Sequence, residues 1–303
     1  MASNYRRNVF FYDDSTQEML GGFYQNSSIT QQNFINLLHI VLVVESHSNS
    51  LPHPFTIFDI SHNEILPTDE ALAIGNYYIV TAPGDSVTMT DEPHIRRIPS
   101  YRISDRNLHF TLSVRNRDRK CVISGDENFE FEIDDWTGFH ACHVFPLEKE
   151  EHWIRQGFDK WVPNAVPGSD TSLINSVQNG LLMQTQYHEL FEKYYFGINP
   201  DDNYKITCFR RDNHNIDGKH LDPVCRNEND PNRVPDQYLR WHFRQCVLAN
   251  MRGAGEKTFE SDFSSCNDMI AEFNEAPHAR ERLEMEVYHR LRIWDGWNLQ
   301  VIK

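Results

Sequence analysis

Short runs of aromatic and β-branched residues recur along the first 95 residues. Three of them, VFFYDD, PFTIFDI and NYYIVTAP, are bounded by Pro, Gly, Asn or Asp, which predicts strands. In the segment TQQNFINLLHIVLVVES, Thr30 is a good N-cap and apolar residues follow at helical spacing: Phe34, Leu37, Leu38, Val41 and Leu42. This pattern predicts a helix, and residues 1–95 are therefore expected to form a β-rich α+β module.

The polarity pattern of the middle of the chain predicts two strands followed by a helix. FHACHVFP alternates as a strand does, with Pro146 at its end. Asn179-Gly180 is a turn signal, and the short apolar run LLM comes directly after it. Thr185 is placed to cap a helix through QYHELFEKYYF. We expect residues 96–210 to form a second domain, with residues 148–174 as an insertion.

The last third of the chain begins with a polar stretch and continues with helical patterns. Residues 211–236 read as a long loop, because Gly and Pro interrupt a run of polar residues. Three helical segments follow, DQYLRWHFRQCVLANM, DMIAEFNEA and HARERLEMEVYHRLR. Residues 211–303 are thus expected to be a loop and helices that pack on the body. The predicted fold class for the whole chain is α+β.

Composition narrows the class of protein. The 303 residues are 39% hydrophobic and 24% charged, as in folded globular proteins. The longest apolar stretch, Ile35–Val44, is too short to cross a membrane, and the N-terminus lacks the apolar region of a secretory signal. Six cysteines without a CxxC pair indicate reduced thiols. We expect an intracellular protein, cytoplasmic or nuclear, with no membrane partner.

The net charge of −15 excludes a protein that coats nucleic acid by bulk attraction. The distribution is uneven, however, because residues 96–120 carry eight basic and two acidic side chains. This block is a candidate DNA or RNA contact through Arg115, Arg117, Arg119 and Lys120. The alternative is a solvated face that pairs with the acidic segment 126–151, which has nine acids and one lysine.

Two histidines stand where they can do chemistry. His188 and Glu192 are four residues apart on the predicted helix, so they share one face and can bind a divalent ion. Such pairs are also common on exposed helix faces. His143 lies near the end of a predicted strand and is placed to project into a cleft. The alternative for His143 is a half-buried ring that is bonded to a backbone carbonyl.

The order of these residues resembles the ββα-metal finger of the HNH nucleases. His143 on a strand, Asn179 at a turn and His188 on a helix follow each other as in that family, with the family's usual eight residues between Asn179 and His188. The segment VRNRDRKCVISG also resembles the stretch that leads into HNH domains. Segments along most of the chain look like fungal proteins described as HNH nuclease domain-containing.

The resemblance implies a metal-dependent endonuclease that hydrolyses phosphodiester bonds. His143 would be the general base and Asn179 would orient it. His188 would hold one divalent cation, Mg, Mn or Zn, with Glu192 as a second ligand. The residue before the base completes the metal site in many HNH nucleases, and here it is Cys142. The four basic side chains Arg115, Arg117, Arg119 and Lys120 would face the phosphate backbone.

This sequence departs from the family pattern in ways that support other functions. Cys142 is a soft ligand that suits Zn better than Mg, and His140, on the same strand face, is available to compensate. Thirty-five residues separate His143 from Asn179, and their aromatic side chains can form a lid over a small organic ligand: Trp153, Phe158 and Trp161. An HNH-like scaffold that acts on a small molecule is therefore an alternative, and a non-enzymatic interaction module is another.

Overall fold

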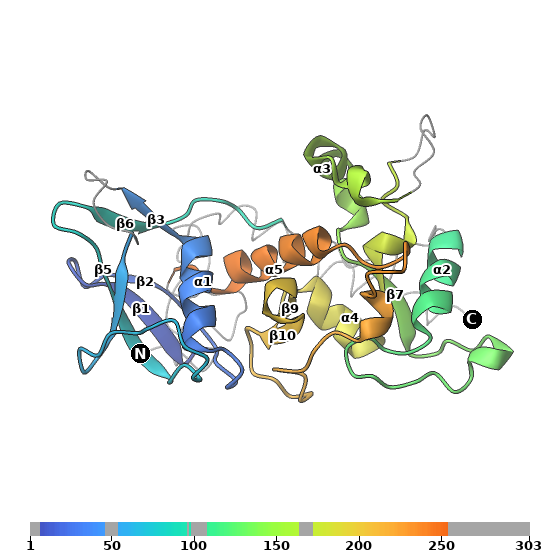
Figure 1. Cartoon of the computed structure of the whole chain (residues 1–303), viewed down its shortest axis with the longest axis horizontal. Helices are drawn as coiled ribbons and strands as arrows, with labels where there is room; N and C mark the ends of the chain where they lie inside the picture. Colours follow the sequence, from blue (N-terminus) through green and yellow to red (C-terminus); the bar gives the residue numbers. More distant parts are fainter. Residues whose placement is uncertain (1–6, 46–53, 96, 98–107, 164–171, 254–303) are drawn as a thin grey trace, which may run out of the picture. The chain divides into compact units, whose positions relative to one another are not determined.

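The computed structural model describes residues 7–45, 54–95, 97, 108–163 and 172–253. By their contacts, residues 6–253 form one compact unit, in which helices and strands are mixed along the chain (Figure 1). The α+β class is confirmed.

A four-stranded sheet, a two-stranded sheet and one helix make up the described part of the N-terminal module. The strands of this region are β1 (Val9–Asp13), β2 (Met19–Phe23), β3 (Leu42–Glu45), β4 (Thr56–Asp59), β5 (Gly75–Val80) and β6 (Ser86–Met89). Strands β3 and β6 form the two-stranded sheet. The order of the four-stranded sheet is β2-β1-β5-β4, in which β1 is parallel to β5 and the other neighbours are antiparallel. Helix α1 (Gln31–Val41) packs on the sheet through Phe34, whose ring contacts three aromatic rings: Phe11, Phe23 and Tyr77.

The helix predicted after Thr30 is confirmed, but it is shorter than expected. Thr30 caps it by accepting from the backbone of Asn33, and the Asn33 side chain bonds back to Thr30, which forms a capping box. The helix ends at Val41, and Leu42–Glu45 pair with β6 as strand β3. The residues LVVE are rich in β-branched side chains, which favour a strand once a partner strand is available.

The central region contains the predicted strand–strand–helix order. Strand β7 (Phe139–His143) is antiparallel to β8 (Gly180–Gln184), and α4 (Thr185–Glu192) follows directly. The N-cap of α4 is Gln184 rather than Thr185, whose hydroxyl donates to the Gly138 carbonyl instead. The other elements of this region are α2 (Leu108–Asp118), α3 (Glu150–Gln156), β9 (Phe196–Asn199), β10 (Lys205–Cys208) and the 3-10 turns η2 (Phe131–Ile133), η3 (Leu147–Lys149), η4 (Phe158–Trp161), η5 (Val177–Asn179), η6 (Pro200–Asp202) and η7 (Pro223–Cys225).

Of the three aromatic side chains predicted to form a lid, Trp153 and Phe158 pack in the central core and Trp161 is exposed. Trp153 is fully buried, and its ring packs on Phe145, Phe158 and Tyr238. Its indole N–H donates to the Ser172 carbonyl at 2.7 Å. The expectation of a lid was wrong for Trp153, because burial of a large apolar ring with a satisfied N–H is favourable.

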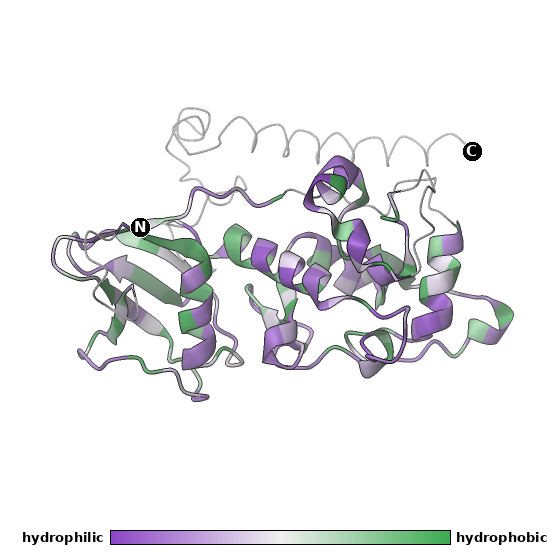
Figure 2. Cartoon of the chain, turned by 45° about the horizontal axis from the view of Figure 1, so that its top comes forward, coloured by the Kyte–Doolittle hydropathy of each residue, from purple (hydrophilic) through white to green (hydrophobic). Residues whose placement is uncertain are grey.

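Helix α5 (Asp236–Asn250) confirms the first helix predicted in the C-terminal region and connects two hydrophobic cores. Phe243 and Val247 belong to the core of the N-terminal module, whereas Tyr238 and Leu239 belong to the central core. Figure 2 shows the N-terminal sheet as largely hydrophobic and the helices as mixed in polarity. Among the described helices, none is both long and apolar enough to cross a membrane. The two further helices predicted in this region lie outside the described residues.

Helix α2 lies so close to β8 that the first residue of the strand has to be glycine. A Cβ on Gly180 would lie 2.4 Å from Val114 Cγ2 and 2.8 Å from the Phe110 ring. We therefore expect Gly180→Ala to lower the free energy of unfolding by about 1–3 kcal/mol through overpacking. Urea unfolding measures this loss. A double variant with Val114→Ala removes one clashing methyl and should lose less than the sum of the two single changes; strict additivity would contradict the contact.

Candidate functional site

The side chain of His143 lies in a closed environment built by α2 and the loop before β8. His143 is the last residue of β7, pairs with Gly180 and is 7% exposed. Its ring stacks on Phe110 with centroids 3.9 Å apart and an angle of 6°. Its Nε2 lies 3.1 Å from Oδ1 of Asn175. Neither Phe110 nor Asn175 was singled out from the sequence, because nothing in their local pattern marks a contact with a residue over 30 positions away.

The side chain of Asn179 forms hydrogen bonds with backbone groups and not with the His143 ring. It is fully buried, and its Oδ1 accepts from the Phe145 N–H at 2.7 Å. Its Nδ2 donates to the carbonyls of Phe145 and Ile174 at 3.1 and 2.9 Å. The Asn179 carbonyl also accepts from the Val144 N–H at 2.9 Å. Asn179 thus ties the turn before β8 to the two residues that follow His143, and it can orient His143 only through the chain.

A pair of imidazoles lies between β7 and α4. Nδ1 of His140 is 3.2 Å from Nδ1 of His188. Nε2 of His188 is 3.2 Å from a carboxylate oxygen of Glu192, as the i, i+4 spacing predicted. His188 and Glu192 are both buried. Since Glu192 and His140 face opposite nitrogens of the same ring, one ion on His188 cannot be bound by both.

The thiol of Cys142 is buried beside His188. Its sulfur donates to the His143 carbonyl at 3.4 Å. Burial alone would disfavour a charged imidazole, but Cys142 and Glu192 outweigh it and raise the pKa of His188 to about 10. Cys142 and His140 share one face of β7, whereas the alternation of the strand directs His143 toward α2.

The two imidazole nitrogens of His140 and His188 are spaced so that one metal ion could bind both of them. Two imidazole nitrogens on one Zn²⁺, each about 2.0–2.1 Å from it at a tetrahedral angle, are about 3.3 Å apart. The separation of the His140 and His188 nitrogens, 3.2 Å, is close to this value. No group of three or more His, Cys, Asp or Glu side chains in a position to hold a metal ion occurs among the described residues. An ion at this pair would keep open positions, as catalytic metal sites do.

The predicted phosphate contacts are largely occupied by protein groups. The Arg117 guanidinium is buried against Asp118, with an N–O distance of 2.6 Å, and also donates to three backbone carbonyls, those of Val177, Gly180 and Asn232. The other three basic side chains also contact protein groups. Arg115 lies over the Trp136 ring and Arg119 over the Phe131 ring, and Lys120 forms an ion pair with Asp222. These contacts differ from the alternative of a solvated face paired with the acidic segment 126–151, because Arg117 is buried and the acidic partners, Asp118 and Asp222, lie outside that segment.

One more arginine of the basic block lies inside the protein. Arg97 donates from Nη2 to the His143 carbonyl at 2.6 Å and from Nη1 to the Val144 carbonyl at 3.1 Å. Sequence reasoning assigned Arg97 to a surface block and missed this contact. A basic side chain carries no local signal that separates surface from interior use.

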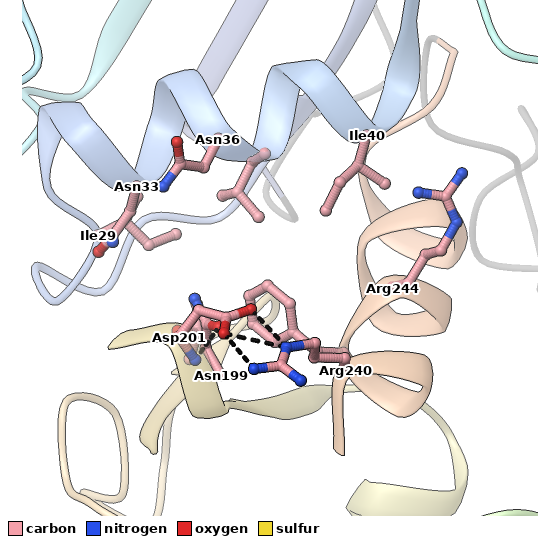
Figure 3. Close-up of a pocket in the computed structure, with 11 residues that line it drawn as sticks. Ile29, Asn33, Asn36, Ile40, Asn199, Asp201, Arg240 and Arg244 are labelled. Atoms are coloured by element: carbon pink, nitrogen blue, oxygen red, sulfur yellow. Dashed lines mark hydrogen bonds and ion pairs between the residues drawn. The ribbon is translucent and has the colours of Figure 1, made fainter. Parts of the chain in front are cut away.

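A pocket of about 330 Å³ lies away from these histidines, between α1 and α5 (Figure 3). Leu37, Ile40 and Phe243 form its apolar part, and Arg240 at its rim is paired with Asp201. None of its lining residues comes from β7, β8 or α4. The small-molecule hypothesis expected a pocket between His143 and the insertion; this one lies elsewhere.

Comparison with known families finds two matches. Residues 121–199 match the HNH endonuclease family, which indicates a nuclease-like domain. Residues 6–84 match a domain of unknown function. No curated protein and no solved structure matches the chain. The HNH match covers β7, β8 and α4, and therefore His143, Asn179 and His188.

The contacts of Arg117 predict a structural role that stability measurements can separate from phosphate binding. Arg117→Met leaves the Asp118 carboxylate buried without its partner, so the free energy of unfolding should fall by about 3–5 kcal/mol. Arg119→Met is the matched control: Arg119 is exposed, and loss of its ring contact should cost at most about 1 kcal/mol. Equal stability of the two variants in urea unfolding would show that Arg117 is not structural.

Proposed function

We propose that this protein is a metal-dependent endonuclease of the HNH type, with His143 as the general base. The main support is the HNH match together with the position of His143 at the end of β7. The adjacent residue, Cys142, contacts the His188 site. His143 and the His188 site lie on opposite faces of β7, so in this proposal the phosphodiester binds around the end of the strand. The likeness to the fungal family remains an inference, since neither match is specific to it.

In this proposal His143 takes a proton from a water molecule, and the hydroxide forms a bond to phosphorus while the bond from phosphorus to the leaving oxygen breaks. That oxygen takes a proton from solvent. The face of the ring is held by Phe110 and its Nε2 edge by Asn175. Asn179 fixes the backbone on the far side of the same residue. These three supports limit rotation of the imidazole, and a fixed base contributes more to the rate than a mobile one.

We assign the ion to Nδ1 of His140 and Nδ1 of His188. When bound, a divalent ion stabilises charge on the phosphate and on the leaving oxygen. Glu192, on the other nitrogen of His188, orients the ring and raises its basicity, as carboxylates behind metal-bound histidines do. Cys142 is buried, and its sulfur lies 3.4 Å from the His143 carbonyl oxygen. Two nitrogen ligands suit Zn better than Mg or Mn, which prefer oxygen ligands.

Two observations support the second candidate, an HNH-like scaffold that acts on a small molecule. The basic side chains proposed to bind phosphate are engaged by protein groups, and the chain carries a net charge of −15. Both features weaken the attraction of a polyanion. A purified protein that contains about one equivalent of metal but cleaves neither plasmid nor single-stranded RNA would favour this candidate.

The first test is the dependence of cleavage on His143. His143→Ala should lower plasmid or RNA cleavage at least about 100-fold with Mg, Mn and Zn, because general-base catalysis contributes that much or more. His109→Ala, an exposed histidine on α2, is the matched control and should retain activity. Circular dichroism checks that both variants are folded. Cleavage that persists in His143→Ala would exclude His143 as the base.

The high pKa of His188 predicts that metal binding releases a proton. At pH 7 the metal-free ring is protonated, so an ion must displace that proton and affinity should rise about tenfold per pH unit between pH 6 and 8. Zn²⁺ titrations by calorimetry in buffers of different ionisation enthalpy count the protons released. Glu192→Gln removes one cause of the raised pKa and should flatten this dependence. An affinity that does not change with pH, or that survives His188→Ala, would contradict the assignment.

A further inference from the structure

The segment between the N-terminal module and the central domain is bonded to α5 and to two residues outside that helix, Tyr194 and Arg252. The carboxylate of Glu92 pairs with Arg244, and its carbonyl accepts from Arg252. The N–H of Ile95 donates to Gln245 at 2.7 Å, and its carbonyl accepts from the Tyr194 hydroxyl at 2.7 Å. These bonds fix the course of the chain immediately before Arg97.

At the end of this segment, the Arg97 guanidinium binds the backbone of the candidate base itself. Its two terminal nitrogens donate to two consecutive carbonyls, those of His143 and Val144. The Cζ atom of the guanidinium also lies 5.7 Å from the centre of the Phe191 ring of α4. Burial disfavours the charge, but nearby Tyr194 and Cys142 raise the pKa of the Arg97 guanidinium, which therefore remains protonated.

We propose that Arg97 is a positioning residue for His143. The two terminal nitrogens of its planar guanidinium, its fork of donors, hold the His143 and Val144 carbonyls. They thereby set the position of the His143 imidazole relative to Phe110 and Asn175. This inference rests on the proposed role of His143 and adds a residue outside the segment that matches the HNH family. Arg97 acts through the backbone and contacts neither water nor substrate in this proposal.

The geometry explains why an arginine is needed here. His143 is the last residue of β7, so the regular pairing with β8 stops at its position. Beyond it, Asn179 bonds to Phe145 on one side of the chain, and Arg97 bonds to the carbonyls of His143 and Val144. A single ammonium group cannot match two carbonyls with two fixed donors as a guanidinium does. Without the fork, the strand end and the ring it carries gain freedom to rotate.

The stacking of His143 on Phe110 offers a readout that does not depend on catalysis. A histidine proton that lies over an aromatic ring has a shifted NMR frequency, so the His143 ring signal of the metal-free protein reports the stack. Selective histidine labelling gives this signal, and its absence in His143→Gln assigns it. In Arg97→Gln the signal should move most of the way to the position of an unstacked histidine. In Arg97→Lys, which keeps the charge but not the fork, it should move part of the way.

The kinetic readout separates positioning from binding of substrate. With plasmid as substrate, Arg97→Gln should lower kcat about 10- to 100-fold and leave KM within about twofold, since a misplaced base slows chemistry without removing substrate contacts. Arg97→Lys should recover part of this loss. Arg244→Gln is the matched control: it breaks the Glu92 pair on the same segment but leaves both bonds of Ile95, so the NMR signal and kcat should change far less than in Arg97→Gln.

The outcomes distinguish this inference from the proposed function. An unmoved His143 signal in folded Arg97→Gln and Arg97→Lys would overturn the positioning role, whatever the activity of the enzyme. Equal effects of Arg97→Gln and Arg244→Gln would overturn it as well, because they would show a general role of the segment. A His143 signal that moves in Arg97→Gln, while the wild-type protein cleaves no nucleic acid, would support the positioning role and reject the nuclease proposal alone.

Discussion

The geometry of the candidate site depends on the close approach of α2 to β8 at Gly180. Because this residue has no side chain, Val114 and Phe110 occupy the space above it. The same approach brings the Phe110 ring against His143, which is paired with Gly180. The buried pair Arg117–Asp118 locks the end of the helix, since Asp118 also accepts from the Leu182 N–H at 2.8 Å. A glycine and one buried ion pair thus determine where the candidate base stands.

The site is supported by segments that are far apart in the chain. Asn175 comes from the end of the insertion, Asn179 from the turn before β8, and Arg97 from the segment that follows the N-terminal module. Helix α5 holds that segment and contributes to the cores on both sides of it. Changes in the N-terminal module therefore have a physical route to His143, through the segment that ends in Arg97.

The contacts of the basic residues in the segment 96–120 change their interpretation. A run of arginines in an acidic chain looks like a phosphate site, because the sequence gives the sign of each charge but not the groups that surround it. In the structure, Arg117 satisfies an internal carboxylate, Arg97 satisfies backbone carbonyls, and Arg119 lies over Phe131. Guanidinium groups serve such internal roles well because five donors are available in one plane. Positive charge in this region contributes to the fold of the site at least as much as to attraction of a ligand.

The sequence by itself determined the local elements and the order of the chemical groups. Periodicity and capping residues predicted α1, α5 and the strands β1, β7 and β8, and the spacing of His188 and Glu192 predicted their contact. Only the tertiary structure decided which nitrogen of His188 faces His140, that Asn175 contacts His143, and that Trp153 is core. The physical reason is the separation of the contacting residues along the chain. Hydrophobic periodicity and helix spacing describe residues within one element, whereas these contacts join residues tens of positions apart. Their geometry depends on how α2, the hairpin and the insertion pack together.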